Sequence, residues 1–266
     1  MPLTVNQAMS TKPSLTLTVV GCCGCFAGPD SPASSYLISL NTPGQRPWKV
    51  VLDLGSGAFG ALQALLDPAA IDAIAISHHH ADHAADLAGL KVYARHNPQG
   101  ALPPIRLFAP AKVFAKQADQ TAFNLTPWQD NQPVTLGPLT LLPRRVQHPV
   151  EAYGIGISFT PDQPADLVYT GDTDLCPAIV ELAGGARVLL ADATFREGVD
   201  LVRGIHLTGR RAGLLAAEAG VGQLILTHLP VWHDPAAIIA EAAAVFAGPI
   251  TLAKPGLSLV IPSVDS

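Results

Sequence analysis

The sequence has no long hydrophobic run, although 48% of its 266 residues are hydrophobic. No stretch reaches the ~18 consecutive apolar residues that a membrane-spanning helix needs, so we expect no membrane partner. Basic residues are also scarce, since 16 Lys and Arg against 21 Asp and Glu give a net charge of −5. This balance disfavours a protein that grips long nucleic acid, because such proteins face their ligand with positive charge.

Cysteine is rare as well, and three of the four cysteines, Cys22, Cys23 and Cys25, lie within four residues. The sequence lacks a second cysteine pair that would complete a structural zinc site, and it lacks the spacing of a disulfide framework. We therefore expect reduced thiols and a cytoplasmic protein, and no specific role for these cysteines follows from the sequence. The glycine-rich residues 21–28 also lack the G-x-x-x-x-G-K pattern of a phosphate-binding loop.

Internal repeats and low-complexity segments are absent too. Residues 1–14 are predicted to form a flexible tail, and residues 15–266 a single domain. The predicted strands cover residues 15–20, 34–40, 48–53, 71–76, 105–108, 132–135, 138–144, 154–160, 166–170, 187–191, 222–227, 249–252 and 257–261. The predicted helices cover residues 57–66, 84–95, 111–118, 208–219 and 235–246. This order suggests two similar halves, each a sheet with helices on one face, which pack as a four-layer α/β/β/α sandwich.

A histidine-rich segment follows the predicted buried strand at 71–76. Residues 77–83 read Ser-His-His-His-Ala-Asp-His, which places four of the nine histidines within six positions. If extended geometry persists beyond the strand, His78 and His80 point to the same side. An accidental polar loop does not explain an aspartate, Asp82, among these histidines. The segment therefore predicts a metal site.

Three later predicted strands also lead into a potential metal ligand, namely His148, Asp172 and His228. The carboxyl ends of strands in α/β folds gather around a common crevice, so these side chains are expected to converge. Five histidines and two aspartates then suffice for two adjacent divalent ions. The assignment is His78, His80 and His148 for one ion, Asp82, His83 and His228 for the other, and Asp172 as the bridge. Imidazole and carboxylate ligands suit zinc, manganese or iron, and zinc is our first choice.

The combined pattern resembles the metallo-β-lactamase superfamily. It consists of His-x-His-x-Asp-His at residues 78–83, then His148, Gly171-Asp172-Thr173 and Thr227-His228. The likeness is closer to the ribonuclease Z-like and cyclic-nucleotide phosphodiesterases of that superfamily, and it covers about residues 15–261. It implies the metallo-β-lactamase fold, a dinuclear metal-dependent hydrolase and a homodimer.

Two departures from other branches narrow the expected activity. His83 completes the second metal site in a way that zinc β-lactamases do not, which counts against antibiotic hydrolysis. Glyoxalase II-like members are expected to carry a His-Thr-Pro-Gly-His-like segment at the third ligand. This chain has Gln-His-Pro-Val-Glu at residues 147–151 instead, which counts against thioester hydrolysis.

The same resemblance assigns a proton donor. Asp192 ends a predicted strand and His206 precedes a predicted helix, in contexts similar to an acidic residue and a histidine that handle the leaving-group proton in ribonuclease Z-like enzymes. His206 is then the general acid, which suits an unperturbed pKa of ~6.5, and Asp192 orients it. The alternative is a surface histidine beside a helix that Thr208 caps.

The expected mechanism follows from two ions about 3.5–4 Å apart, which can hold a bridging hydroxide at neutral pH. The hydroxide is expected to attack phosphorus while the ions neutralise charge on the phosphoryl oxygens. Asp82, as both ligand and catalytic residue, is placed to accept a hydrogen bond from the hydroxide. His206 then protonates the departing alkoxide.

The expected substrate is small. Asp172 follows His148 after only 24 positions, and two predicted strands occupy most of them, so the basic arm of ribonuclease Z-like enzymes does not fit there. We therefore predict 3′,5′-cyclic nucleotides or other small phosphodiesters as substrates, with Trp232, His233 and Phe195 as candidate contacts. The alternatives are a ribonuclease that trims RNA 3′ ends without an arm, and a metal-binding protein without catalysis.

Overall fold

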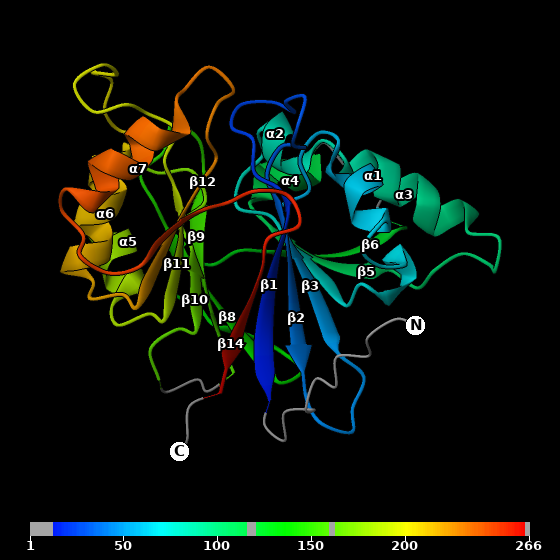
Figure 1. Cartoon of the computed structure of the whole chain (residues 1–266). Coiled ribbons are helices and arrows are strands. Elements are labelled where there is room, and N and C mark those ends of the chain that lie inside the picture. The colour runs from blue at the N-terminus through cyan, green and yellow to red at the C-terminus, as the bar shows by residue number, and fades with distance from the viewer. Residues whose placement is uncertain (1–12, 116–120, 160–162, 264–266) are drawn as a thin grey trace, which may run out of the picture.

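The computed structural model describes residues 13–115, 121–159 and 163–263. Most of the predicted tail at 1–14 lies outside these ranges, and Ser14, which was expected in the tail, already begins the first strand. Two seven-stranded sheets form the middle layers, and helices cover their outer surfaces (Figure 1). The predicted four-layer α/β/β/α sandwich is confirmed.

The first sheet has the strand order β14-β1-β2-β3-β4-β5-β6. Its strands are β1 (Ser14–Gly21), β2 (Ser35–Asn41), β3 (Trp48–Leu52), β4 (Ala73–Ala75), β5 (Ile105–Ala109), β6 (Phe123–Pro127) and β14 (Ser258–Pro262). The strands from β3 to β6 are parallel, whereas β1 pairs antiparallel with β2 and with β14. The associated helices are α1 (Ala58–Gln63), the 3₁₀ helix η1 (Pro68–Ala70), α2 (Ala81–Ala84), α3 (Leu87–His96) and α4 (Ala111–Ala115).

The second sheet has the order β13-β12-β11-β10-β9-β8-β7. Its strands are β7 (Val134–Leu136), β8 (Leu139–Arg145), β9 (Tyr153–Ser158), β10 (Leu167–Tyr169), β11 (Val188–Asp192), β12 (Gln223–Thr227) and β13 (Ile250–Leu252). The strands from β10 to β13 are parallel. Helices α5 (Pro177–Ala183), α6 (Gly209–Glu218) and α7 (Pro235–Ala243) belong to this half.

The hydrophobic core lies between the two sheets. Strand β1 alternates buried and half-buried residues, so that Leu15 and Leu17 point inward. They belong to the same buried cluster as Leu141 of β8 and Ile155 of β9. Each fully buried leucine contributes about 1.5–3 kcal/mol through removal of apolar surface from water. The two sheets are therefore joined face to face by one shared core.

Some predicted elements differ from the observed ones. The C-terminal strand β14 crosses back to pair with β1, so the chain does not divide cleanly into two consecutive halves. The helix predicted at 84–95 is two helices, α2 and α3, and it starts earlier than expected. Strand β6 and helix α5 were not predicted. The ends of the predicted helix at 111–118 and of the predicted strand at 154–160 lie outside the described residues.

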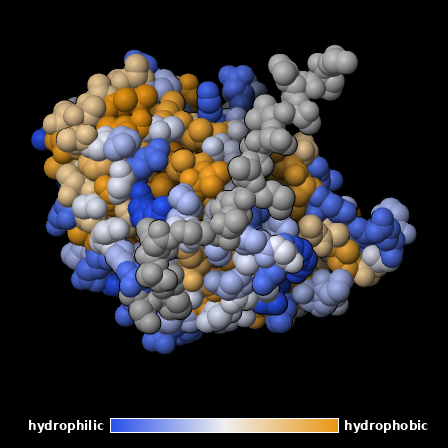
Figure 2. All heavy atoms as spheres, turned by 60° about the horizontal axis from the view of Figure 1, so that its bottom comes forward, coloured by the Kyte–Doolittle hydropathy of each residue, from blue (hydrophilic) through white to orange (hydrophobic). Residues whose placement is uncertain are grey.

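No helix among the described residues has the length and apolar character to cross a membrane. Figure 2 shows the end of the molecule that is lowest in Figure 1, where hydrophilic residues in blue lie between apolar ones in orange. Paler apolar colours prevail at the left of this view, the side on which α5, α6 and α7 lie. Helix α7 on this side of the molecule is rich in alanine and reads Pro-Ala-Ala-Ile-Ile-Ala-Glu-Ala-Ala.

Candidate active site

The structure brings all seven predicted ligands to one edge of the sandwich, where strands of both sheets end. The segments that carry them follow β4 (His78, His80, Asp82 and His83), β8 (His148), β10 (Asp172) and β12 (His228). This edge is uppermost in Figure 1, beside the short helix α2. The expected convergence of strand ends is therefore observed, while the role of each side chain as a ligand stays a prediction.

A first donor cluster consists of His78, His80 and His148. Nε2 of His78 lies 2.9 Å from Nδ1 of His80, and Nε2 of His148 lies 3.4 Å from the same His80 nitrogen. Burial, followed by the positive neighbour His83, holds the pKa of His78 well below its ordinary value. His78 is therefore a neutral imidazole, the form that binds metals.

A second donor cluster consists of Asp82, His83, Asp172 and His228, all of them buried. The two imidazoles face each other, with Nε2 of His83 3.1 Å from Nε2 of His228. Oδ2 of Asp82 lies 3.3 Å from the same His228 nitrogen. Two carboxylates and two imidazoles form a donor set that suits a divalent transition metal.

Asp172 lies between the two clusters. Its Oδ2 is 3.6 Å from Nε2 of His78 in the first cluster, and its Oδ1 is 3.2 Å from Nε2 of His83 in the second. Burial alone raises the pKa of Asp172, but the charges of His228 and His83 outweigh burial and hold it well below the usual range. The carboxylate is thus ionised, and its position is that of the predicted bridge.

The protein groups fit bound cations. Oδ1 of Asp172 is buried and has no hydrogen-bond partner, although imidazole nitrogens surround it. A buried carboxylate oxygen without a partner is costly, and a metal ion supplies the missing interaction. The donor set and this oxygen together favour divalent ions at both clusters.

Hydrogen bonds from the far side of the rings fix which nitrogen faces inward. Nδ1 of His83 donates to Asp53, and Nδ1 of His148 donates to the Ile205 carbonyl. Nδ1 of His228 lies 2.7 Å from Thr194 Oγ1, and Nδ1 of His78 lies 3.1 Å from Ser77 Oγ. Each of these histidines therefore presents Nε2 to its cluster, whereas His80 presents Nδ1. Such outer partners orient ligating histidines and raise their basicity.

Asp53 is a functional residue that the sequence analysis missed. This fully buried carboxylate follows β3 directly and accepts hydrogen bonds from the backbone and side chain of Ser77, from Tyr169 and from His83, at 2.7–2.8 Å. Its position after a strand is the signal that identified the other acidic residues, and it was available in the sequence. Asp53 orients His83 and belongs to the outer shell of the site.

The predicted pair of Asp192 and His206 is present and buried. Asp192 ends β11, and its Oδ2 accepts a hydrogen bond of 2.8 Å from Nδ1 of His206. Thr208 caps α6 through its side chain, as the alternative interpretation required, but His206 is only 9% exposed and is not a surface histidine. Burial lowers the pKa of His206, yet the Asp192 carboxylate outweighs burial and raises it above its ordinary value.

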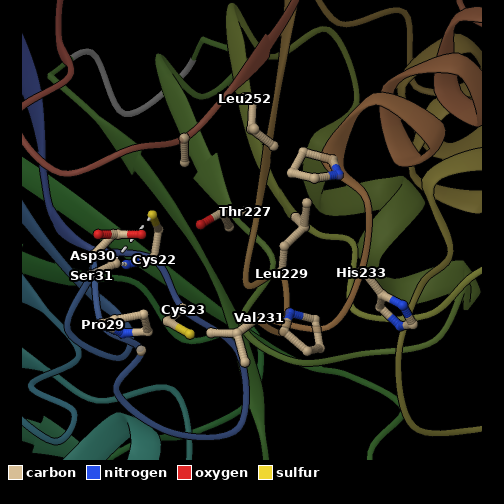
Figure 3. A pocket seen from close by; sticks show the side chains of 14 residues that line it. Cys22, Cys23, Pro29, Asp30, Ser31, Thr227, Leu229, Val231, His233 and Leu252 are labelled. Atoms are coloured by element: carbon tan, nitrogen blue, oxygen red, sulfur yellow. Dashed lines mark hydrogen bonds between the residues drawn. The ribbon is translucent and has the colours of Figure 1, made fainter.

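Two loops form the rim of this edge. Residues 22–31 and 228–235 lie against each other, and the Gly24 amide donates to the Leu229 carbonyl. A largely apolar pocket of about 310 Å³ lies between them, with Asp30 and His233 among its lining residues (Figure 3). None of the seven predicted ligands lines this pocket. It therefore adjoins the donor clusters without containing them.

The cysteines of the first loop are unbridged. Cys22 and Cys23 are buried in the wall of the pocket, and both are labelled in Figure 3. Burial raises the pKa of the Cys22 thiol to about 11 and also raises that of Cys23. Both side chains are therefore neutral thiols of low reactivity at neutral pH.

The three candidate substrate contacts lie in different surroundings. Phe195 packs edge-on against the His206 ring, with centroids 5.0 Å apart. Trp232 is 60% exposed, and its ring centroid lies 5.6 Å from that of the exposed Phe26. His233 lies 3.7 Å from Asp200, which joins the rim to the loop before His206. Aromatic surface is thus available beside the donor clusters.

Comparison with known proteins identifies the family. The family model of the β-lactamase superfamily domain matches residues 49–229. An uncharacterised protein of Mycobacterium tuberculosis is 40% identical over 252 residues, which cover 90% of each chain. The probable metallo-hydrolase YhfI of Bacillus subtilis is 29% identical over 248 residues, covering 91% of this chain and 98% of YhfI.

Solved structures agree with this similarity. The crystal structure of YhfI has a TM-score of 0.84 at 27% identity and covers 93% of this chain and 99% of its own. Human tRNase Z, short form, has a TM-score of 0.68 at 19% identity, with 93% and 100% covered. Yeast PDE1 has a TM-score of 0.71 at 12% identity, with 92% and 99% covered, and these two distant structures show a shared fold alone. The chain is therefore a metal-dependent hydrolase that belongs to the β-lactamase superfamily.

Proposed function

We propose that the protein is a phosphodiesterase that cleaves small phosphodiesters, with 3′,5′-cyclic nucleotides as the foremost substrates. The observation that carries this proposal is the buried pair of Asp192 and His206 beside the two donor clusters. An alkoxide is a poor leaving group, so its departure requires a proton donor at the site. A histidine held by a carboxylate within reach of the clusters meets that requirement.

The proposed metal ligands are the seven residues of the two clusters. His78, His80 and His148 hold one ion, Asp82, His83 and His228 hold the other, and Asp172 contacts both. Divalent ions bound there supply Lewis-acid activation of water and neutralise charge on the phosphoryl group. Zinc is our first choice, and manganese or iron also suits these ligands.

His206 is the proposed general acid and Asp192 its positioning residue. The hydrogen bond to Asp192 occupies Nδ1 of His206, so Nε2 is left to deliver the proton to the leaving oxygen. The raised pKa of His206 favours the protonated ring that this role needs. Asp82 remains the proposed acceptor of a hydrogen bond from the attacking water.

The surroundings support a small substrate. Between His148 and Asp172, the described residues form β9 and β10 of the second sheet. Substrate binding is then left to the rim, where Trp232 and Phe26 expose aromatic surface suited to stacking on a flat base. A homodimer and a cytoplasmic location belong to the same proposal.

A ribonuclease that trims RNA 3′ ends is the second candidate. It is favoured by the fold shared with human tRNase Z, short form. The net charge of −5 counts against it, because RNA substrates require a positively charged surface. The alternative of a metal-binding protein without catalysis is disfavoured, because the buried pair of Asp192 and His206 lies beside the clusters and the relative YhfI is a probable metallo-hydrolase.

Hydrolysis of 3′,5′-cyclic AMP by the purified, zinc- or manganese-loaded protein tests the proposal, with chromatography of the product. We expect turnover to AMP by the wild type and a loss of at least about 100-fold in Asp172→Ala, since both clusters lose a ligand. Glu218→Ala, which removes an exposed carboxylate on α6, is the matched control and is expected to retain activity. Absence of turnover in the metal-loaded wild type contradicts the cyclic-nucleotide proposal, and cleavage of RNA 3′ ends instead favours the second candidate.

A further inference from the structure

A buried ion pair lies just outside the two donor clusters. Asp174 is 1% exposed and Arg211 is 6% exposed, and Nη1 of Arg211 contacts Oδ1 of Asp174. Removal of two charges from water costs about as much as their attraction returns, so such a pair is a weak source of stability. Its contacts indicate what it does instead.

The pair holds the backbone that carries His206. The same Nη1 of Arg211 donates to the His206 carbonyl at 3.1 Å. Oδ2 of Asp174 accepts from the Gly204 amide at 2.7 Å, and from Nε of Arg203 at 2.8 Å. The chain is therefore held at His206 itself and two residues before it.

Both members of the pair are held in place through their backbone amides. Arg211 lies in the first turn of α6, and its backbone amide donates to the capping hydroxyl of Thr208. The Asp174 amide donates to the carbonyl of Gln147, the residue before the ligand His148. Asp174 thus links the segment that carries Asp172 to the segments that carry His148 and His206.

The loop that leads to His206 is held by polar contacts rather than by apolar packing. Val199, Leu201 and Val202 are 67%, 81% and 55% exposed, so the large apolar side chains of this loop are not anchored in the core. A loop with few buried apolar contacts opens easily unless polar contacts hold it. The ion pair supplies such contacts at the end of the loop where His206 lies.

We propose that Asp174 and Arg211 are positioning residues that hold His206 in place for proton transfer to the leaving group. This inference rests on the proposed phosphodiesterase function. Arg211 fixes the His206 carbonyl, Asp174 fixes Arg211 and the Gly204 amide, and Asp192 then sets the direction of the ring.

Two substrates separate this role from a general structural one. Cyclic AMP releases an alkoxide, which needs a proton as it leaves. Bis(p-nitrophenyl) phosphate releases p-nitrophenolate, which departs as an anion near neutral pH and does not depend on a general acid. The kcat/KM values of Arg211→Leu, Arg211→Lys and Asp174→Asn are measured on both substrates, with His206→Ala as the reference.

We expect Arg211→Leu to lower kcat/KM for cyclic AMP about 10–100-fold, which is a smaller loss than removal of the general acid itself would cause. The kcat/KM value for bis(p-nitrophenyl) phosphate is expected to change by less than about threefold. Arg211→Lys keeps the positive charge beside Asp174 but replaces the planar guanidinium, whose Nη1 contacts both partners, by a flexible ammonium group, so the same selectivity is expected. It provides the test if Arg211→Leu does not fold. Arg210→Leu, an exposed neighbour on α6, is the matched control and is expected to leave both substrates unaffected.

The inference requires that His206→Ala lowers kcat/KM for cyclic AMP more than for bis(p-nitrophenyl) phosphate. If it does, and the Arg211 and Asp174 variants lose kcat/KM equally on both substrates or on neither, the inference is overturned. If His206→Ala lowers both substrates equally, the general-acid assignment of the proposed function fails, and the positioning role falls with it. If the wild type does not hydrolyse cyclic AMP, the proposed function fails first. The two failures are thus distinguishable.

Discussion

Asp53 has a backbone φ of 53°, in the left-handed region that residues other than glycine rarely adopt. Its carboxylate accepts two hydrogen bonds from Ser77 and one each from Tyr169 and His83. A backbone conformation of this kind costs of order 1–3 kcal/mol and persists only where surrounding contacts determine it. At the residue scale, the outer shell of the site is thus held in place by one carboxylate that contacts three partners.

Replacement of this carboxylate tests that view. Asp53→Asn exchanges one acceptor oxygen for an NH₂ group that faces donors, so we expect a loss of about 1–3 kcal/mol in the free energy of unfolding. His83 also loses its orientation, so zinc affinity is expected to fall about 10–100-fold. Urea unfolding of the metal-free protein and calorimetric zinc titration measure the two effects.

Tyr169→Phe is the control, because it removes one donor to Asp53 and leaves the His83 contact intact. It is expected to cost about 1 kcal/mol of stability and to keep the zinc affinity. An unchanged zinc affinity in Asp53→Asn would show that His83 does not need this partner.

At the scale of elements, the packing of α6 on α7 depends on two glycines one turn apart. A Cβ atom at Gly209 would overlap the Ile238 carbonyl, and one at Gly213 would lie 2.7 Å from the Ala242 carbonyl. The two helices therefore approach more closely than any side chain there permits. The approach matters to the site because α6 begins just after His206.

Glycine-to-alanine changes at two helices are therefore expected to have opposite signs. Gly213→Ala should lower the free energy of unfolding by about 1–3 kcal/mol, since backbone atoms of α7 must move. Gly60→Ala in α1 meets no atom within 4 Å and should raise it by up to about 1 kcal/mol through helix propensity. Denaturant unfolding of both variants checks the pair, and a gain in Gly213→Ala would contradict the close packing.

Elements with a strong local pattern could be predicted from the sequence, and others could not. Strand β12 was predicted within a residue, because Leu-Ile-Leu is a buried apolar run between polar residues. Helix α5 has seven residues between Pro177 and Ala183 and is too short for a helical period to emerge. Strand β6 ends in Pro127 and exposes Asn124, so its assignment depends on pairing with β5 rather than on its own sequence.

The same contrast holds within the site. His148, Asp172 and His228 were predicted because each lies within three residues of the end of a strand, a property that the sequence indicates. The outer partners, Thr194 and the Ile205 carbonyl, were not predicted, because they contact their histidines from segments 34 and 57 residues away in the sequence. Only the folded chain shows these distances.

At the scale of the whole molecule, the site joins the two halves of the sandwich. Each donor cluster combines side chains from residues 78–83, which follow β4 of the first sheet, with a histidine that follows a strand of the second sheet, namely His148 or His228. The two sheets share one core, so the spacing between these contributions is fixed by packing rather than by loops. This arrangement explains how a strand-end motif in one half and single histidines in the other make one site.

The number of divalent ions bound per chain shows whether the two donor clusters are metal sites. Metal-depleted protein is dialysed against zinc, freed of excess metal and analysed by mass spectrometry for metal and protein content. We expect two ions per chain in the wild type and about one in His148→Ala, because the first ion then keeps only His78, His80 and the shared carboxylate of Asp172. One ion or none in the wild type would contradict the claim that the two clusters form adjoining metal sites.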